Sequence, residues 1–346
     1  MQSQCVIATV IDTSHSIVLS IARDIRCSPQ IMYLNVFAQS NDPLDMTAMP
    51  EFAQLVSSAE TLGLAVPRQP KCLSRNVVVN GLRFHVLEWG VRVAPSIVAL
   101  HGGGQTAHSW DFVALTLSEQ FHVVAIDQRG HGDSEWPRDG ERSRSAMADD
   151  VAKIVAVLGC EAPVLVGHSM GGLVAMTMAM EHVDTVSRVV LVDVGPAPSA
   201  GVRGAIRSAP RRAAEYSSID AFIDAVVAAD PRRDPESLRR TVKYNIMQRA
   251  DGVFVRKNDA RPWGNGPQDP IRWAEDFDDA ARIASLERCS VLLVRGAESH
   301  ILGARAAEAF VHALPNARLV TVPSCGHNVH TQNPVGFIEA VHSFIS

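Results

Sequence analysis

Ala162-Pro163-Val164-Leu165-Val166-Gly167-His168-Ser169-Met170-Gly171-Gly172 is the stretch that decides the fold. It begins as an apolar run rich in β-branched residues, which is typical of a buried strand, and it leads into a helix-favouring sequence at 173–180. The Gly-x-Ser-x-Gly between them predicts a tight turn that holds the Ser169 hydroxyl at a sheet edge and a helix N-terminus. The alternative is a glycine-rich turn in which Ser169 only caps the helix.

Composition limits the possible classes of protein. The chain has 346 residues, of which 47% are hydrophobic and 20% charged, so it can bury the core of one large α/β domain, with or without an insertion. A net charge of -5 argues against nucleic acid as the main partner.

Cysteine usage and hydropathy indicate the compartment. The six cysteines form no C-x-x-C pair, which favours reduced thiols in a cytoplasmic protein over disulfides or a zinc site. No apolar run reaches membrane-spanning length, and the N-terminus lacks the features of a signal peptide.

Predicted strands and helices alternate over residues 76–199 and again over 284–346. Strands are expected at 76–79, 82–88, 95–100, 121–126, 162–166, 186–192, 290–294 and 317–322. Helices are expected at 110–118, 145–158, 304–314 and 337–344. This alternation predicts an α/β fold with a mostly parallel, doubly wound sheet of eight strands, with ligands bound at the carboxyl ends of the strands.

Two further segments are predicted outside the sheet. Residues 1–75 are expected to be an N-terminal extension and linker with one helix at 51–62. Residues 200–283 are charged and helical, with helices at 219–229 and 235–249, and are predicted to form an inserted helical cap. The apolar face of the cap is expected both to cover an apolar substrate pocket and to pack the cap onto the domain; it comprises Ile219, Phe222, Ile223, Val226 and Val227.

A serine nucleophile needs a base, because a serine hydroxyl is weakly nucleophilic at neutral pH. His327 follows the last predicted strand directly after Gly326, where a loop can bring its ring over the serine. Ser169 and His327 are therefore the candidate nucleophile and general base.

Four motifs occur in a fixed order, namely HGGG at 101–104, DQRGHGDS at 127–134, GHSMGG at 167–172 and GHNVH at 326–330. With them, residues 76–346 resemble the α/β-hydrolase superfamily. The resemblance implies the α/β-hydrolase fold and an oxyanion hole formed by the backbone N–H groups of Gly103 and Met170. It implies no cofactor. A metal is not expected either, because no carboxylate motif completes a site with His327 and His330.

The acid that orients His327 is open at this point. The superfamily usually supplies an aspartate after the seventh strand, but here that loop reads Gly296-Ala297-Glu298-Ser299-His300, with histidine at the expected position. Asp193 at the end of the sixth strand is one alternative and Glu298 is another; in the third the triad is incomplete and activity is weak. Asp193 can also be a structural loop cap.

These residues predict hydrolysis of a small apolar carboxylic ester or lactone through an acyl-enzyme on Ser169. A serine at the elbow, where an aspartate is the alternative, argues against epoxide hydrolase and haloalkane dehalogenase chemistry. Two alternatives share the same motifs: hydrolysis of a carbon–carbon bond in a β-diketone or ring-cleavage product, and ligand binding without catalysis. The oligomeric state is unknown from the sequence.

Overall fold

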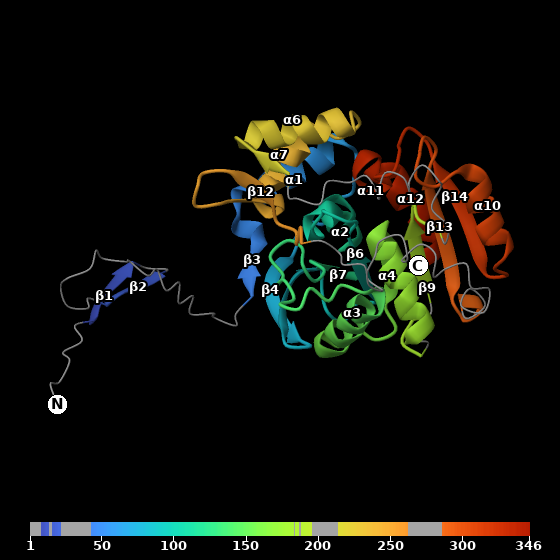
Figure 1. The fold of residues 1–346 in the computed structure, drawn as a ribbon. Coiled ribbons are helices and arrows are strands. Elements are labelled where there is room, and N and C mark those ends of the chain that lie inside the picture. Colours follow the sequence, from blue (N-terminus) through green and yellow to red (C-terminus); the bar gives the residue numbers. More distant parts are fainter. Residues whose placement is uncertain are drawn as a thin grey trace. The chain divides into compact units, whose positions relative to one another are not determined.

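The computed structural model consists of two units, residues 1–43 and residues 44–346. The structure describes residues 8–13, 16–21, 43–182, 184–186, 188–195, 214–261 and 286–346. In the first unit, β1 (Ala8–Thr13) pairs antiparallel with β2 (Ser16–Ile21). The large sheet and the candidate site belong to the second unit (Figure 1).

The sheet of the second unit has nine strands in the order β14-β13-β9-β8-β6-β7-β5-β4-β3. All pairs from β14 to β7 are parallel, so the predicted fold class is confirmed. The ninth strand is the two-residue edge strand β3, which the sequence did not predict. The strands are β3 (Leu44–Asp45), β4 (Cys72–Val79), β5 (Leu82–Trp89), β6 (Ser96–Leu100), β7 (His122–Ile126), β8 (Val164–His168), β9 (Arg188–Val192), β13 (Ser290–Gly296) and β14 (Ala317–Val322).

Helices cover both faces of this sheet, because neighbouring residues of each central strand point to opposite sides. Val98 and Leu100 of β6 join the core of one face, whereas Ile97 and Ala99 join the core of the other. On the first face lie α3 (Arg144–Leu158), α4 (Met170–Glu181) and α10 (Ala304–His312). On the second lie α1 (Pro50–Thr61), α2 (Asp111–Leu117) and α12 (Pro334–Ile345).

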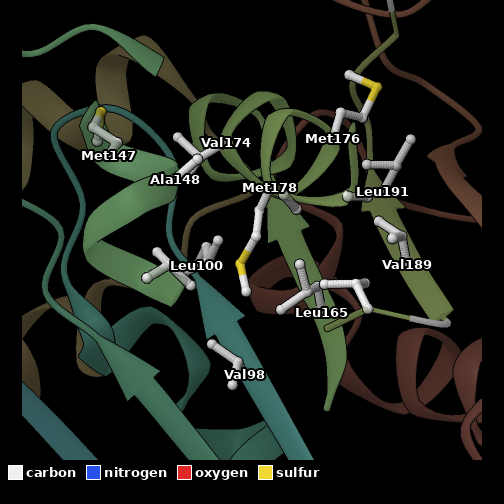
Figure 2. Packing of buried hydrophobic residues seen from close by; sticks show 14 of the residues in the cluster. Val98, Leu100, Met147, Ala148, Leu165, Val174, Met176, Met178, Val189 and Leu191 are labelled. Carbon is white, nitrogen blue, oxygen red and sulfur yellow. The ribbon is translucent and has the colours of Figure 1, made fainter. Parts of the chain in front are cut away.

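The core of the first face holds α4 against the sheet (Figure 2). Strand side chains of β6, β8 and β9 there meet Met147 and Ala148 of α3 and Val174 and Met178 of α4. Each of these four helix residues is at most 2% exposed. Such complete burial stabilises the fold by about 1.5–3 kcal/mol for each large side chain, so the N-terminus of α4 has a fixed position at the end of β8.

Part of the predicted N-terminal extension belongs to the core of the second unit. Phe52, Leu55 and Ala59 of α1 are buried, and the Phe52 ring stacks on Trp89 of β5 with 5.9 Å between ring centroids. β4 begins at Cys72, four residues earlier than the predicted strand at 76. The apolar face of α1 fixes the helix predicted at 51–62 on the sheet.

The predicted cap is described for residues 214–261; the remainder of the predicted segment 200–283 lies outside the described residues. It contains α6 (Ile219–Ala229) and α7 (Pro235–Asn245), which lie above the sheet at the top of Figure 1. It also contains a small antiparallel sheet of β10 (Glu215–Tyr216), β12 (Phe254–Arg256) and β11 (Ile246–Gln248). The helix expected to reach residue 249 ends at Asn245, because the chain becomes extended at Ile246 to pair with β12.

The apolar face predicted on α6 packs inside the cap itself. Phe222 and Ile223 are buried against Leu238, Val242 and Ile246, with Val226 and Val227 partly buried beside them. Ile219 is exposed. In the described part of the chain this face therefore packs against α7 and β11, and its covering of an apolar substrate pocket stays a prediction.

Polar contacts join the cap to the turn at 127–134. The Lys257 ammonium lies 2.6 Å from the Asp133 carboxylate. The backbone N–H of Asp259 donates to Gly130 O at 2.7 Å, and the N–H of Gly132 donates to Lys257 O at 2.7 Å. This turn therefore supports the cap. Among the helices that the structure describes, none is long and apolar enough to cross a membrane.

Candidate active site

Ser169 occupies the turn between β8 and α4 in a strained backbone conformation, with φ 50° and ψ -116°. Its N–H donates to Val192 O on the neighbouring strand at 3.1 Å. A Cβ at Gly171 would lie 2.3 Å from Leu100 O, so only glycine allows α4 to approach β6 this closely. The sequence thereby places the serine hydroxyl at the carboxyl end of the parallel strands and at a helix N-terminus.

His327 lies in the loop between β14 and α11 (Val329–Gln332), and its Nδ1 is 2.8 Å from Asp193 Oδ2. A carboxylate oxygen accepts, so Nδ1 carries the proton and donates it. Nε2 then holds the lone pair that a general base needs.

Asp193 follows β9, is completely buried, and has φ 50°. Its Oδ1 accepts the N–H of Gly296 at 3.1 Å, and its Oδ2 accepts the Ser299 hydroxyl at 2.5 Å as well as His327. Three donors compensate the cost of burying the carboxylate and fix its orientation toward His327.

The loop after β13 holds the other two positions considered for the acid. Glu298 is exposed and forms an ion pair with Arg232 of the cap, and His300 is exposed. This loop donates two hydrogen bonds to Asp193, one from the Gly296 N–H and one from the Ser299 hydroxyl. Ser299 was not singled out from the sequence; the only signal was its place just before the position expected to hold the aspartate.

The two predicted oxyanion-hole residues lie on adjacent loops. Met170 is the first residue of α4, so its N–H has no carbonyl partner in the helix. Gly103 follows β6 and is exposed; a Cβ built on it would be 4.0 Å from Met170 Sδ. Within the described part of the chain, no acceptor binds the Gly103 N–H. Two backbone donors are therefore available near Ser169.

A polar network connects the oxyanion loop to the loop of His327. Gln105 Oε1 accepts the Gly102 N–H at 2.9 Å, and its Nε2 donates to Asn328 Oδ1 at 2.8 Å. His168 Nε2 donates to His327 O at 3.0 Å. Burial, followed by the nearby His327 and His330, lowers the pKa of His168 well below its ordinary value, so the ring stays neutral. Sequence reasoning did not identify Gln105, which carries no recognisable motif.

Residues 95–334 match the family described as alpha/beta hydrolase fold. The chain belongs to the α/β-hydrolase family. It is 33% identical over 311 residues to esterase Rv0045c of Mycobacterium tuberculosis, covering 87% of this chain and 97% of that protein. A crystal structure of that esterase covers 87% of this chain and 99% of its own, at 33% identity and a TM-score of 0.67. The sn-1-specific diacylglycerol lipase ABHD11 of Mus musculus is 29% identical over 284 residues, 77% of this chain and 85% of the lipase.

The turn at 127–134 of this α/β-hydrolase is held by hydrogen bonds to Asp127. Oδ1 of this buried carboxylate accepts the Ala107 N–H at 2.6 Å, and Oδ2 accepts from His85 at 2.8 Å and from the Asp133 N–H at 2.9 Å. Burial alone raises the pKa of Asp127, but His85 and the other donors outweigh it and lower the pKa.

The atoms of His85, Asp127 and Asp133 lie within 4.8 Å of one another, close enough to hold a metal. Protein donors already occupy the oxygens of Asp127, and Lys257 neutralises Asp133. The trio fits a structural turn better than a metal site. His330, the other residue considered for metal binding, is completely buried and stacks on Trp110 with 4.1 Å between ring centroids.

A cavity of about 50 Å³ lies beside Gln105, between the cap and the short helix η2 (Ala107–Trp110) that precedes α2. Most of the residues that line it are polar. The lining residues are Gln105, His108, Ser109, Phe112, Arg233, Asp234, Ser237, Leu238, Arg240, Thr241, Asn245 and Thr331.

Proposed function

We propose that this α/β-hydrolase cleaves carboxylic esters through an acyl-enzyme on Ser169, with His327 as general base and Asp193 as the acid behind it. The observation that carries the proposal is the 2.8 Å hydrogen bond between His327 Nδ1 and the buried Asp193. It leaves the Nε2 lone pair available for the serine proton. The 33% identity to a protein named esterase Rv0045c supports the ester substrate class.

The reaction has two halves. In the first, Ser169 Oγ attacks the ester carbonyl while His327 Nε2 takes its proton, and the oxyanion accepts hydrogen bonds from the N–H groups of Gly103 and Met170. The His327 imidazolium, stabilised by Asp193, then protonates the leaving alcohol oxygen. In the second, His327 takes a proton from water as the water attacks the acyl group, and the acid leaves as Ser169 regains its proton.

Lactones fall under the same proposal, because a lactone is an ester whose leaving alcohol remains attached to the acyl group. The same bonds are formed and broken with either substrate, and the two halves of the reaction are unchanged. Comparing a lactone with an open-chain ester of similar size measures which one the protein prefers.

A fluorophosphonate probe tests the proposal, because it phosphonylates an activated serine. We expect one label, on Ser169, in the wild-type protein and no label in Ser169→Ala. Ser57→Ala, which alters an exposed serine of α1, is the control and should label normally. A Ser169→Ala protein that still hydrolyses a panel of acyl esters at the wild-type rate contradicts the proposal.

A further inference from the structure

We propose that the cavity beside Gln105 binds a carboxylate of the substrate through Arg233, so that the preferred esters carry a free acid group near the scissile bond. This inference rests on the proposed ester hydrolysis. It assigns the substrate class as hemiesters of dicarboxylic acids and related acidic esters.

Arg233 is the central residue of this site. It lies in the link between α6 and α7 and lines the cavity. In the part of the chain that the structure describes, its guanidinium has no hydrogen bond or ion pair, although the residue is partly buried. Burial lowers the pKa of Arg233 more than the nearby Asp230 raises it, but an arginine keeps its charge in a protein. Partly buried guanidinium donors without an acceptor are costly, and a bound anion that accepts from them lowers that cost.

Three residues that line the cavity each carry a buried polar atom without a hydrogen-bond partner, namely Ser109 Oγ, Arg240 Nε and His108 Nε2. Arg240 is paired through Nη1 with Asp111 at 2.6 Å. The side chains of Ser109 and Arg240 therefore bring hydrogen-bond donors to the lining that contains the unbonded Arg233 guanidinium. This set of donors favours an acceptor-only group such as a carboxylate.

The nearby carboxylates accept hydrogen bonds from other groups, and in the described part of the chain neither accepts one from the Arg233 guanidinium. Asp234 caps α7 by accepting the N–H of Ser237 at 2.9 Å and its hydroxyl at 2.7 Å. Asp230 accepts from Asn328 at 3.0 Å and from Gln332 at 2.6 Å.

Size and location fit a group of the substrate. A water needs about 10–15 Å³ of such space, so the cavity of about 50 Å³ has room for a carboxylate. Gln105 forms part of its wall and bonds to Gly102 of the oxyanion loop and to Asn328, the neighbour of His327. The charge of Arg233 also reaches His168, next to Ser169. A short chain can therefore connect a carboxylate here with an ester carbonyl at Ser169.

The test compares one 4-nitrophenyl hemiester, 4-nitrophenyl hydrogen glutarate, with the same compound after methylation of its free acid. We expect wild-type protein to show the higher kcat/KM for the hemiester. Arg233→Met should lower the ratio of the two kcat/KM values by about ten- to a hundredfold, because one charge-assisted contact is lost. Arg233→Lys should restore most of the ratio. Arg239→Met is the matched control: Arg239 lies on α7, is exposed, pairs with Asp220, and should leave the ratio unchanged.

Binding without turnover separates this inference from the proposed function. Glutarate should bind to Ser169→Ala in calorimetry, and more weakly by a similar factor when Arg233→Met is added. If Arg233→Met has a wild-type melting temperature and leaves the ratio of the two kcat/KM values unchanged, the carboxylate site is wrong and the proposed ester hydrolysis still stands. If the wild-type protein hydrolyses neither ester, the proposed function is contradicted. Glutarate binding then still tests the carboxylate site.

Discussion

Asp193 and His327 are 134 positions apart in the chain, yet the His327 ring donates a 2.8 Å hydrogen bond to the Asp193 carboxylate. The contact forms because β9 and β14 lie on either side of β13, so their carboxyl ends meet at one edge of the sheet.

Replacing Asp193 with asparagine should lower kcat for ester hydrolysis by about 10³- to 10⁴-fold, because the amide does not hold His327 in the required tautomer. Steady-state kinetics on a 4-nitrophenyl ester measures this. Glu298→Gln should change kcat by less than tenfold, since Glu298 is exposed and pairs with Arg232. Equal losses in the two variants contradict the assignment of Asp193 as the acid.

Ser299→Ala should lower kcat about fivefold, because the loss of one hydrogen bond to Asp193 costs about 1 kcal/mol. KM should change little, since Ser299 bonds to the acid and has no assigned contact with the substrate. The neighbouring His300 is exposed, so His300→Ala is the control, and neither it nor His300→Asp should alter kcat. A gain of activity in His300→Asp shows that Asp193 is not the working acid.

Gly171→Ala should destabilise the protein by about 2 kcal/mol or more, because the new methyl group meets the backbone oxygen of Leu100 at 2.3 Å. Urea unfolding followed by circular dichroism measures this. Gly303→Ala serves as the control: nothing lies within 4 Å of its Cβ, and it should cost less than about 1 kcal/mol. Equal midpoints for the two variants contradict the close approach of α4 to β6.

The stability of the fold should fall as the pH rises from about 6.5 to about 9. Burial lowers the pKa of His122, but Cys160 and Glu88 outweigh it and raise the pKa to about 9. A folded-state pKa above the unfolded value means that protonation favours the folded protein, and this contribution is lost at high pH.

Unfolding midpoints measured across this pH range test the linkage. His122→Gln should flatten the pH dependence, and His312→Gln, at an exposed histidine, should not. A wild-type free energy of unfolding that does not change between pH 6.5 and pH 9 contradicts the role of His122.

The sequence predicted the features that depend on local pattern. The strand, turn and helix around Ser169 and the loop of His327 are each continuous in the sequence, so their motifs could be recognised from it. Asp193 was only one of three alternatives, because the choice depends on which loops the sheet order brings together. Gln105 and Ser299 have no motif, and their roles follow only from contacts between distant loops.

The cap shows a different limit of the sequence. The spacing of Phe222, Ile223 and Val226 correctly predicted a helix with one apolar face. The spacing of apolar residues along a helix shows which face is buried, but it does not show which surface buries that face. Here α7 and β11 bury that face, and the cavity lies between α7 and η2.

The hydrogen bond from the Ser169 N–H to Val192 O joins the proposed nucleophile directly to the residue before Asp193. The spacing between serine and acid is thus an internal property of the sheet, shielded from fluctuations of the surface. In the loop after β13, Gly296 and Ser299 belong to this internal arrangement because both bond to Asp193, whereas Glu298 and His300 point to solvent. Because Glu298 pairs with Arg232, next to Arg233, we expect substitutions at Glu298 to act on the proposed carboxylate site and to leave the contact between Asp193 and His327 in place.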